Sequence, residues 1–399
     1  MNKRVFVFYI LSVQGVSAIT SFLISIYLFS IYGSDWFGEF SYYVYLSLLV
    51  FTIVSLGLPE FFQSRFSKGQ IIKFSLGGVF LYLLFFLSVL LVSSFVSEFF
   101  FGVSLSELEV FLLGVYSLAA ISLEVLSRFF IHENRIVVSQ TCLSIQPIFM
   151  WIGCAISLWF GVLPNPIYIT ALASFIGLCL MCFVVRHDLN RFFGNFSNCN
   201  FSHFSVSKIK SVVFFNRFNV VILDSMPVFI FAALDMFAFA GIYALCARVL
   251  MPFSMVANGM ASFVRKITLE GAGDKGGVVR LVYIYFFVLL LVGVAVLVAI
   301  YNDFLQARAL VAMPDGMEVL CGLILLYRIF YLVVNFSNSI FLRWLLESSG
   351  SKLLITINLL AYLFLASISE FLSIEYVFVC SVLILVLNIG CYFRLIKVV

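Results

Sequence analysis

Long uncharged apolar stretches recur about twelve times in this chain of 399 residues. Nearly all Lys and Arg residues lie in alternate connections between these stretches. The hydrocarbon core of a bilayer is about 30 Å thick, so a helix that crosses it needs roughly 20 apolar residues. Only 11% of the residues are charged and 64% are hydrophobic, whereas soluble domains carry about 25% charged residues. The pattern predicts an all-α polytopic membrane protein.

The apolar stretches define about twelve predicted transmembrane helices. The first follows Lys3 and Arg4, but it is too long for a signal peptide and no small-residue cleavage site follows it, so we expect it to remain as a helix. The twelve predicted spans are Val5–Ile31, Tyr42–Phe62, Phe74–Val96, Val110–Leu126, Val137–Phe160, Ile167–Val185, Val212–Ala233, Phe237–Val264, Val278–Tyr301, Met317–Leu342, Leu353–Ile368 and Ile374–Phe393.

The cationic residues predict the orientation of these spans. If the N-terminus is cytoplasmic, 19 of the 23 Lys and Arg lie on the cytoplasmic side and Arg308 alone lies opposite. Cytoplasmic loops are enriched in Lys and Arg, so this arrangement satisfies the positive-inside rule. Both termini are then cytoplasmic, which requires an even number of spans, and twelve fits.

A polar connection divides the chain after the sixth predicted span. We expect a six-helix bundle over residues 1–190, a cytoplasmic linker over residues 191–210, and a second six-helix bundle over residues 211–399. A short internal similarity supports two halves, because Gly38 and Gly57 in the first half resemble Gly241 and Gly259 in the second. Repeated halves are common in transporters, with the substrate site at their interface near the midplane.

Four charged residues are predicted to lie deep in the membrane. They are Arg217 and Asp224 on the seventh span, Arg248 on the eighth and Arg328 on the tenth. A charge at the centre of a membrane helix costs about 2.5–3.5 kcal/mol on insertion scales, so each one needs a physical reason. The spacing places Asp224, Arg248 and Arg328 at one level, with Arg217 nearer the cytoplasm.

We expect Arg217, Arg248, Arg328 and Asn335 to bind an anionic substrate, because an Arg guanidinium can hold a phosphate through two parallel hydrogen bonds. Asp224 is the deep group that titrates, and it is therefore the candidate for proton coupling. Two alternatives stay open: an Asp224–Arg248 ion pair that only joins two helices, and an Arg217 side chain that extends toward the interface.

Polar side chains at helical spacing extend the candidate site. The predicted cavity-lining residues are Gln14, Ser17, Ser21, Tyr331 and Asn338. Small polar residues in membrane helices also serve helix packing, which is an alternative reading for the first helix. Prolines inside spans remove backbone hydrogen bonds and bend helices, although many merely shape packing. The hinge candidates are Pro59, Pro147, Pro227 and Pro252.

The sequence predicts neither a metal site nor a cofactor. The three histidines, His132, His187 and His203, are scattered over predicted loops without ligand spacing. Glu124 lies near the end of its span, where we expect a structural pair with Arg128 four residues further on. Topology and anionic lipid explain the basic loops, so no nucleic-acid partner is expected.

Two segments resemble a known transporter family. Residues 32–40 (YGSDWFGEF), followed by Leu56-Gly57-Leu58 and Arg65, are similar to the first helical hairpin of polysaccharide-biosynthesis flippases. Residues 241–248 (GIYALCAR) resemble the glycine-tyrosine signature of that family. These flippases belong to the multidrug/oligosaccharidyl-lipid/polysaccharide exporter superfamily, and the resemblance in length and span number extends along the whole chain.

The resemblance implies a flippase in the bacterial inner membrane. Its expected partner is undecaprenyl-pyrophosphate-linked oligosaccharide, an O-antigen or capsule repeat unit, moved from the cytoplasmic to the periplasmic leaflet by alternating access through a cationic central cavity. A polysaccharide polymerase and chain-length machinery are further implied partners. The alternatives are a multidrug-type exporter of the same superfamily, a membrane glycan polymerase or glycosyltransferase, and a non-transporting scaffold.

Overall fold

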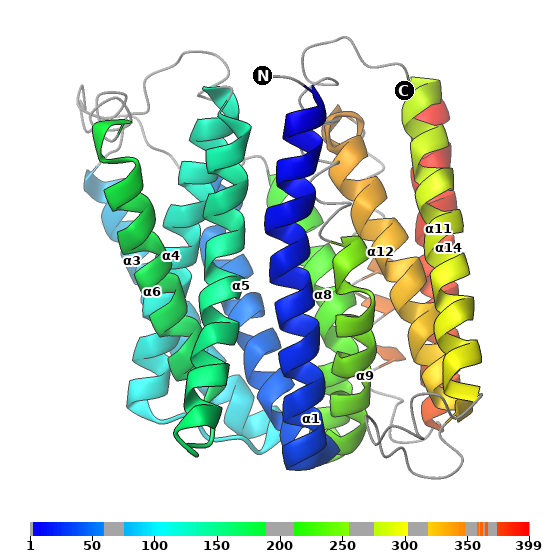
Figure 1. The fold of residues 1–399 in the computed structure, drawn as a ribbon, viewed down its shortest axis with the longest axis horizontal. Coiled ribbons are helices and arrows are strands. Elements are labelled where there is room, and N and C mark those ends of the chain that lie inside the picture. Colours follow the sequence, from blue (N-terminus) through cyan, green and yellow to red (C-terminus); the bar gives the residue numbers. More distant parts are fainter. Residues whose placement is uncertain are drawn as a thin grey trace. The chain divides into compact units, whose positions relative to one another are not determined.

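A computed structural model describes residues 3–59, 76–133, 135–188, 211–254, 275–301, 318–347, 357–358, 360–361, 364–365 and 373–398. Within these ranges the chain is helical, with turns between helices and no strand (Figure 1). The helices are α1 (Lys3–Ser55), α3 (Leu76–Phe101), α4 (Glu107–His132), α5 (Ile136–Trp159), α6 (Pro166–Val184), α8 (Ser211–Ala233), α9 (Phe237–Val249), α11 (Lys275–Tyr301), α12 (Glu318–Glu347) and α14 (Ile374–Val398).

The first two predicted spans are joined in α1, which is broken at a single residue, Gly33, with φ 82° and ψ 177°. Glycine alone adopts this backbone region freely. The rings of Phe29 and Phe37 lie 5.8 Å apart, although eight residues of straight helix span about 12 Å, so the chain bends sharply here. The first two predicted spans, Val5–Ile31 and Tyr42–Phe62, imply a short loop over Gly33–Ser41 between them. That prediction is wrong, since helix resumes at Ser34.

The prediction of a helical, multi-pass membrane protein is confirmed by the described residues. The 41 residues of Gly15–Ser55 are about twice what one crossing needs, and the count of twelve spans stays a prediction. In the described part of the chain, six helices are long and apolar enough to cross a membrane: Gly15–Ser55, Phe80–Phe99, Glu107–Ile131, Val137–Trp159, Pro166–Val184 and Val319–Ser337.

Exposed apolar side chains follow α3 along its length. Phe80, Leu91 and Phe99 each expose 60% or more of their surface. A soluble monomer rarely exposes an apolar surface of this extent, whereas hydrocarbon covers it without cost. The surface of α3 therefore agrees with a lipid environment.

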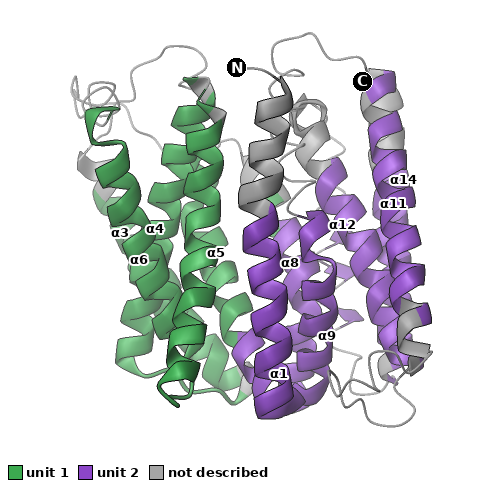
Figure 2. Ribbon diagram, viewed as in Figure 1, with its two compact units in different colours: residues 1–13, 43–218 green, residues 14–42, 219–399 purple. Residues whose placement is uncertain are grey.

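The chain divides into two compact units (Figure 2). Unit 1 comprises residues 1–13 and 43–218, and in it α4 packs against α3, α5 and α6. Unit 2 comprises residues 14–42 and 219–399, and in it α12 packs against α9, α11 and α14. The predicted linker 191–210 lies outside the described residues. Residues 14–42 group with unit 2, although the sequence analysis assigned them to the first half.

Two glycines allow α1 and α9 to touch through their backbones inside unit 2. A Cβ atom on Gly38 would overlap the carbonyl of Phe237, and one on Gly241 would overlap the carbonyl of Ser34. Phe237 precedes Gly241 by four residues, and Ser34 precedes Gly38 by four. Each glycine thus faces the equivalent carbonyl of the other helix, and the contact is reciprocal.

We predict that Gly33→Ala lowers the free energy of unfolding by about 1–3 kcal/mol, because alanine at this φ is strained. Nothing lies within 4 Å of a Cβ placed at Gly33, so strain is the whole effect. Gly15→Ala is the matched control, since Gly15 is helical with equally open space, and we expect it to be neutral or stabilising. Unfolding in detergent, followed by circular dichroism, measures both; equal midpoints would contradict the prediction.

We predict that Gly241→Ala destabilises unit 2 by about 1–3 kcal/mol or more, because the new methyl group forces α9 away from α1. The control is Gly390→Ala in α14, where a Cβ meets nothing within 4 Å. Thermal unfolding of the purified variants checks the difference. A wild-type midpoint for Gly241→Ala would mean that the two backbones do not touch.

Candidate functional site

The candidate site centres on an ion pair between α8 and α12. Arg328 Nη1 bonds to Asp224 Oδ1, and the two side chains expose only 7% and 16% of their surface. The same nitrogen donates to Tyr243 Oη of α9 at 2.8 Å. Three helices thus converge on one guanidinium, and the charge of Arg328 is balanced by Asp224 within unit 2.

Aromatic rings enclose the guanidinium of Arg328. Its central carbon lies 5.2 Å from the ring centre of Tyr243 and 4.8 Å from that of Tyr331. An Arg placed over a tyrosine ring is attracted by the negative face of the ring, more strongly when water is excluded. Tyr331, predicted to line a cavity, is buried and packs on Arg328. The rings hold the guanidinium in place and exclude water.

The second predicted arginine of unit 2 lies in a neighbouring contact. Arg248 Nη1 donates to Met251 Sδ at 3.5 Å, and Ser21 Oγ of α1 donates to the same sulfur at 3.1 Å. The structure therefore links Arg248 and Ser21 through one methionine. In the structure Asp224 pairs with Arg328. The alternative considered from the sequence was an ion pair between Asp224 and Arg248.

Arg217 belongs to unit 1 and has different partners from Asp224, although both residues lie on α8. Arg217 Nη2 bonds to Glu124 Oε2 at 2.6 Å, and its guanidinium lies 4.8 Å from the ring centre of Phe51. Glu124 also pairs with Arg128 at 3.0 Å, which confirms the predicted i,i+4 pair. One carboxylate thus holds two arginines, and the substrate-binding role of Arg217 stays a prediction.

The remaining predicted site residues, which are cavity-lining candidates and the substrate-binding candidate Asn335, divide into buried and partly exposed positions. Ser17 is fully buried, and its hydroxyl has no hydrogen-bond partner among the described residues. Such a position favours the packing alternative for α1. Asn335 is partly exposed on α12. The side chains of Gln14 and Asn338 lie outside the described set.

The predicted hinges occupy different local structures. Pro147 lies inside α5 and Pro227 inside α8. Pro59 is buried just after α1, and Pro252 lies in the short helical stretch that follows α9. Their roles as hinges stay predictions, but Pro227 is the one that lies beside the candidate site, three residues beyond Asp224.

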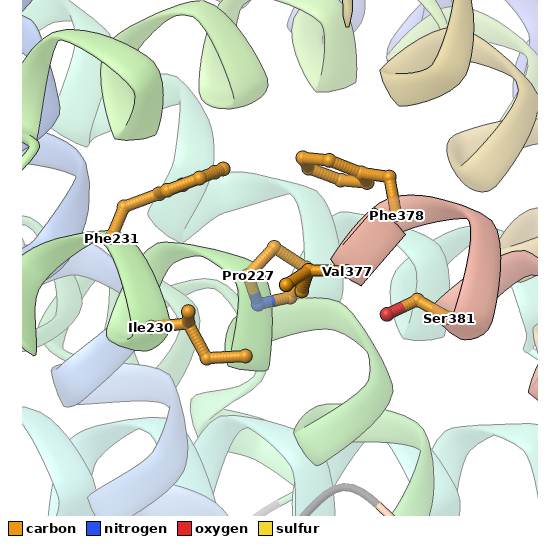
Figure 3. A pocket seen from close by; sticks show the side chains of 6 residues that line it. All are labelled: Pro227, Ile230, Phe231, Val377, Phe378 and Ser381. Carbon is orange, nitrogen blue, oxygen red and sulfur yellow. The ribbon is translucent and has the colours of Figure 1, made fainter. Parts of the chain in front are cut away.

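A small hollow lies between α8 and α14, close to Pro227 (Figure 3). It has room for roughly one water molecule. No charged side chain lines it, so it is not the predicted cationic cavity, which stays a prediction. The lining residues are Pro227, Ile230, Phe231, Val377, Phe378 and Ser381.

Sequence reasoning missed the tyrosines that complete the site. Tyr243 was singled out only as part of a resemblance, and Tyr327 was not singled out. One feature of the sequence could have indicated a role for Tyr327, namely its position directly before the deep Arg328. The pairing of Arg217 with Glu124 was also missed, because the two residues are far apart along the chain and no local pattern relates them.

No group suited to a metal ion occurs among the described residues. There the structure brings together no three or more His, Cys, Asp and Glu side chains. Cys246 of α9 and Cys321 of α12 are both buried, on two helices that pack against each other.

Comparisons with known proteins do not identify a family for this chain. No protein-family model matches the chain, and no curated protein matches it. The resemblance to polysaccharide flippases therefore rests on the residues given above.

We predict that Glu124→Gln lowers the free energy of unfolding by about 3–5 kcal/mol, because it leaves two largely buried arginines without their shared carboxylate. Asp188→Asn is the control, since it breaks the pair between Asp188 and Arg135, whose side chains are 26% and 44% exposed. An exposed pair contributes about 0–1 kcal/mol. Denaturant unfolding in detergent measures both. Equal losses would show that the Glu124 cluster does not stabilise unit 1.

Proposed function

We propose that this protein is a lipid-linked oligosaccharide flippase. In this proposal twelve spans form two six-helix halves in a bacterial inner membrane, and the chain moves an undecaprenyl-pyrophosphate-linked repeat unit to the periplasmic leaflet by alternating access. The observation that carries the proposal is the buried Asp224–Arg328 pair of α8 and α12, completed by Tyr243 of α9.

A buried ion pair is a poor means of stabilising a membrane helix bundle. Desolvation opposes the attraction between the charges, and apolar residues of similar volume are often as stable or more stable. Ionisable groups inside membrane spans therefore commonly belong to transport pathways and proton relays. This argument favours a functional role for Asp224 and Arg328 over a purely structural one.

The pairing suggests how transport and protonation are coupled. Arg328 already has an anionic partner, so a pyrophosphate that binds it must replace Asp224. Protonation of Asp224 removes its negative charge and releases the guanidinium for the phosphate. Departure of the substrate and loss of the proton then restore the ion pair. One guanidinium thus alternates between an internal carboxylate and the substrate.

The contact between Gly38 and Gly241 supports two related halves. These glycines are the matching positions of the internal similarity, and each faces the carbonyl four residues before the other. Reciprocal contacts of this kind arise where two equivalent elements meet across a two-fold axis. The contact therefore supports the proposal that α1 and α9 hold equivalent places in two related halves.

The alternatives predict different chemistry at the same site. An exporter of cationic drugs needs an acid that is available to a cation, whereas Asp224 is neutralised by Arg328. A glycan polymerase or glycosyltransferase needs catalytic groups in an extramembrane segment, and the predicted outer loops of this sequence are short. The deep arginine favours a phosphate-bearing substrate.

We expect a strain that lacks this protein to accumulate undecaprenyl-pyrophosphate-linked oligosaccharide on the cytoplasmic face and to lose surface polysaccharide. The wild-type gene should restore the polymer, whereas Asp224→Asn or Arg328→Lys should not. Thin-layer analysis of the lipid fraction and quantification of surface polymer measure both effects.

Two controls separate function from folding. The double variant Asp224→Asn/Arg328→Gln removes both charges together, so its protein level should recover while export stays absent. Arg135→Gln alters an exposed pair and should complement fully. Normal polymer with the double variant would remove the proposed role of the pair, and the absence of lipid-linked sugar in the deletion strain would overturn the flippase proposal.

A further inference from the structure

The hydroxyl groups of two tyrosines lie against the backbone of α8 beside Asp224. Tyr327 of α12 donates to the carbonyl of Leu223. Tyr243 of α9 donates to the next carbonyl, that of Asp224, at 2.8 Å. Two consecutive carbonyls of one helix thus receive side-chain donors from two other helices.

Pro227 explains why one of these donors is needed. In a helix the carbonyl of residue 223 accepts the amide N–H of residue 227, and proline has no N–H. Leu223 and Tyr327 are fully buried. An unsatisfied carbonyl in an apolar interior costs several kcal/mol, so a replacement donor is strongly favoured. The hydroxyl of Tyr327 occupies the place of the missing amide.

The carbonyl of Asp224 is different, since Val228 retains an N–H for it. Tyr243 therefore adds a second donor there, whereas Tyr327 replaces an absent one. This difference between neighbouring carbonyls makes Tyr243 the matched control for Tyr327.

The backbone bond and the ion pair are formed by neighbouring residues on both helices. Tyr327 and Arg328 are consecutive in α12, and Leu223 and Asp224 are consecutive in α8. The bond from Tyr327 therefore fixes the height and rotation of α8 at the residue before Asp224. A shift of α8 that breaks one contact also disturbs the other.

An aromatic cluster holds the tyrosine rings. The ring centres of Tyr243 and Tyr327 lie 6.1 Å apart, and Phe378 of α14 lies 6.4 Å and 5.9 Å from them. Figure 3 shows side chains of α14 beside Pro227. Because the rings are packed from several sides, the hydroxyl of Tyr327 is aimed at Leu223 before any substrate arrives.

We propose that Tyr327 is a positioning residue of the candidate site: its hydroxyl replaces the amide that Pro227 lacks and thereby holds Asp224 opposite Arg328. The part of this proposal that concerns transport rests on the proposed function. The part that concerns the Leu223 carbonyl does not. A ring that serves packing alone would keep its effect when the hydroxyl is removed.

The test is a set of variants built on Tyr327→Phe and Pro227→Ala. Tyr327→Phe keeps the ring and removes the donor, so the midpoint of thermal unfolding in detergent should fall. Pro227→Ala restores an N–H at position 227, so adding Tyr327→Phe to it should cause no further fall. The fall caused by Tyr243→Phe should persist in the Pro227→Ala background. A wild-type midpoint for Tyr327→Phe would overturn the proposal. So would a fall of the same size when Tyr327→Phe is added to Pro227→Ala.

A second measurement reports on Asp224 itself. Dicyclohexylcarbodiimide labels protonated carboxyl groups in apolar surroundings, and the labelled residue is identified by mass spectrometry. Tyr327→Phe should speed labelling of Asp224 several-fold by loosening its pair with Arg328. When Pro227→Ala is combined with Tyr327→Phe, the labelling of Asp224 should return to the wild-type rate. Glu124, which lies in unit 1, is the internal control and should not change. An unchanged rate at Asp224 would reduce Tyr327 to a packing residue.

Export of lipid-linked oligosaccharide in the complemented deletion strain completes the test. Export should fall with Tyr327→Phe as the labelling rate of Asp224 rises. If the wild-type protein exports no lipid-linked sugar, the proposed function fails while unfolding and labelling still decide the role of Tyr327. If export is normal with Tyr327→Phe, the positioning role is wrong and the flippase proposal stands.

Discussion

A charged side chain buried inside this protein must find its partner within the protein, because hydrocarbon offers none. The ion pair between Asp224 and Arg328 is the clearest result of that constraint. It draws α8 and α12 together, and Tyr243 adds α9 to the same point. Glu124 serves unit 1 in a comparable way by holding Arg128 and Arg217. Each unit is thus organised around a carboxylate with cationic neighbours.

The bonds to α8 follow from the same constraint at the level of the backbone. A proline in a soluble helix can leave a carbonyl to water, but the buried carbonyl of Leu223 has to be satisfied by another helix. Tyr327 meets that need and thereby ties a local break in α8 to the position of α12. The bond thereby fixes the proline segment of α8 in position relative to the charged site.

Much of the fold could be predicted from the sequence because the signals are local. The length of the apolar stretches predicted the helices. Ser106 and Glu109 form a capping box at the start of α4, which had not been predicted although its pattern is local. The short loop over Gly33–Ser41 was predicted wrongly, since the chain turns at the single residue Gly33 and the helix then resumes. The grouping of residues 14–42 with unit 2 could not be foreseen, because no local pattern states which distant helix a segment contacts.

The candidate site was predicted in its charges but not in its pairing. The depth estimate placed Asp224, Arg248 and Arg328 at one level, yet three groups at one level permit more than one ion pair. Side-chain direction decides among them, and it depends on the rotation of each helix about its axis. The tyrosines were harder still, because a tyrosine in an apolar helix has many packing uses and its hydroxyl gains meaning only beside Pro227.

The reciprocal contact of Gly38 and Gly241 has a consequence for tracing the ancestry of this chain. A larger residue at either glycine would overlap the backbone of the other helix, so substitution is restricted at both positions even though they lie far apart in the sequence. Apolar spans diverge readily while keeping their composition, and overall similarity fades early. Glycines at both positions would therefore be retained in distantly related proteins after the rest of the sequence has diverged.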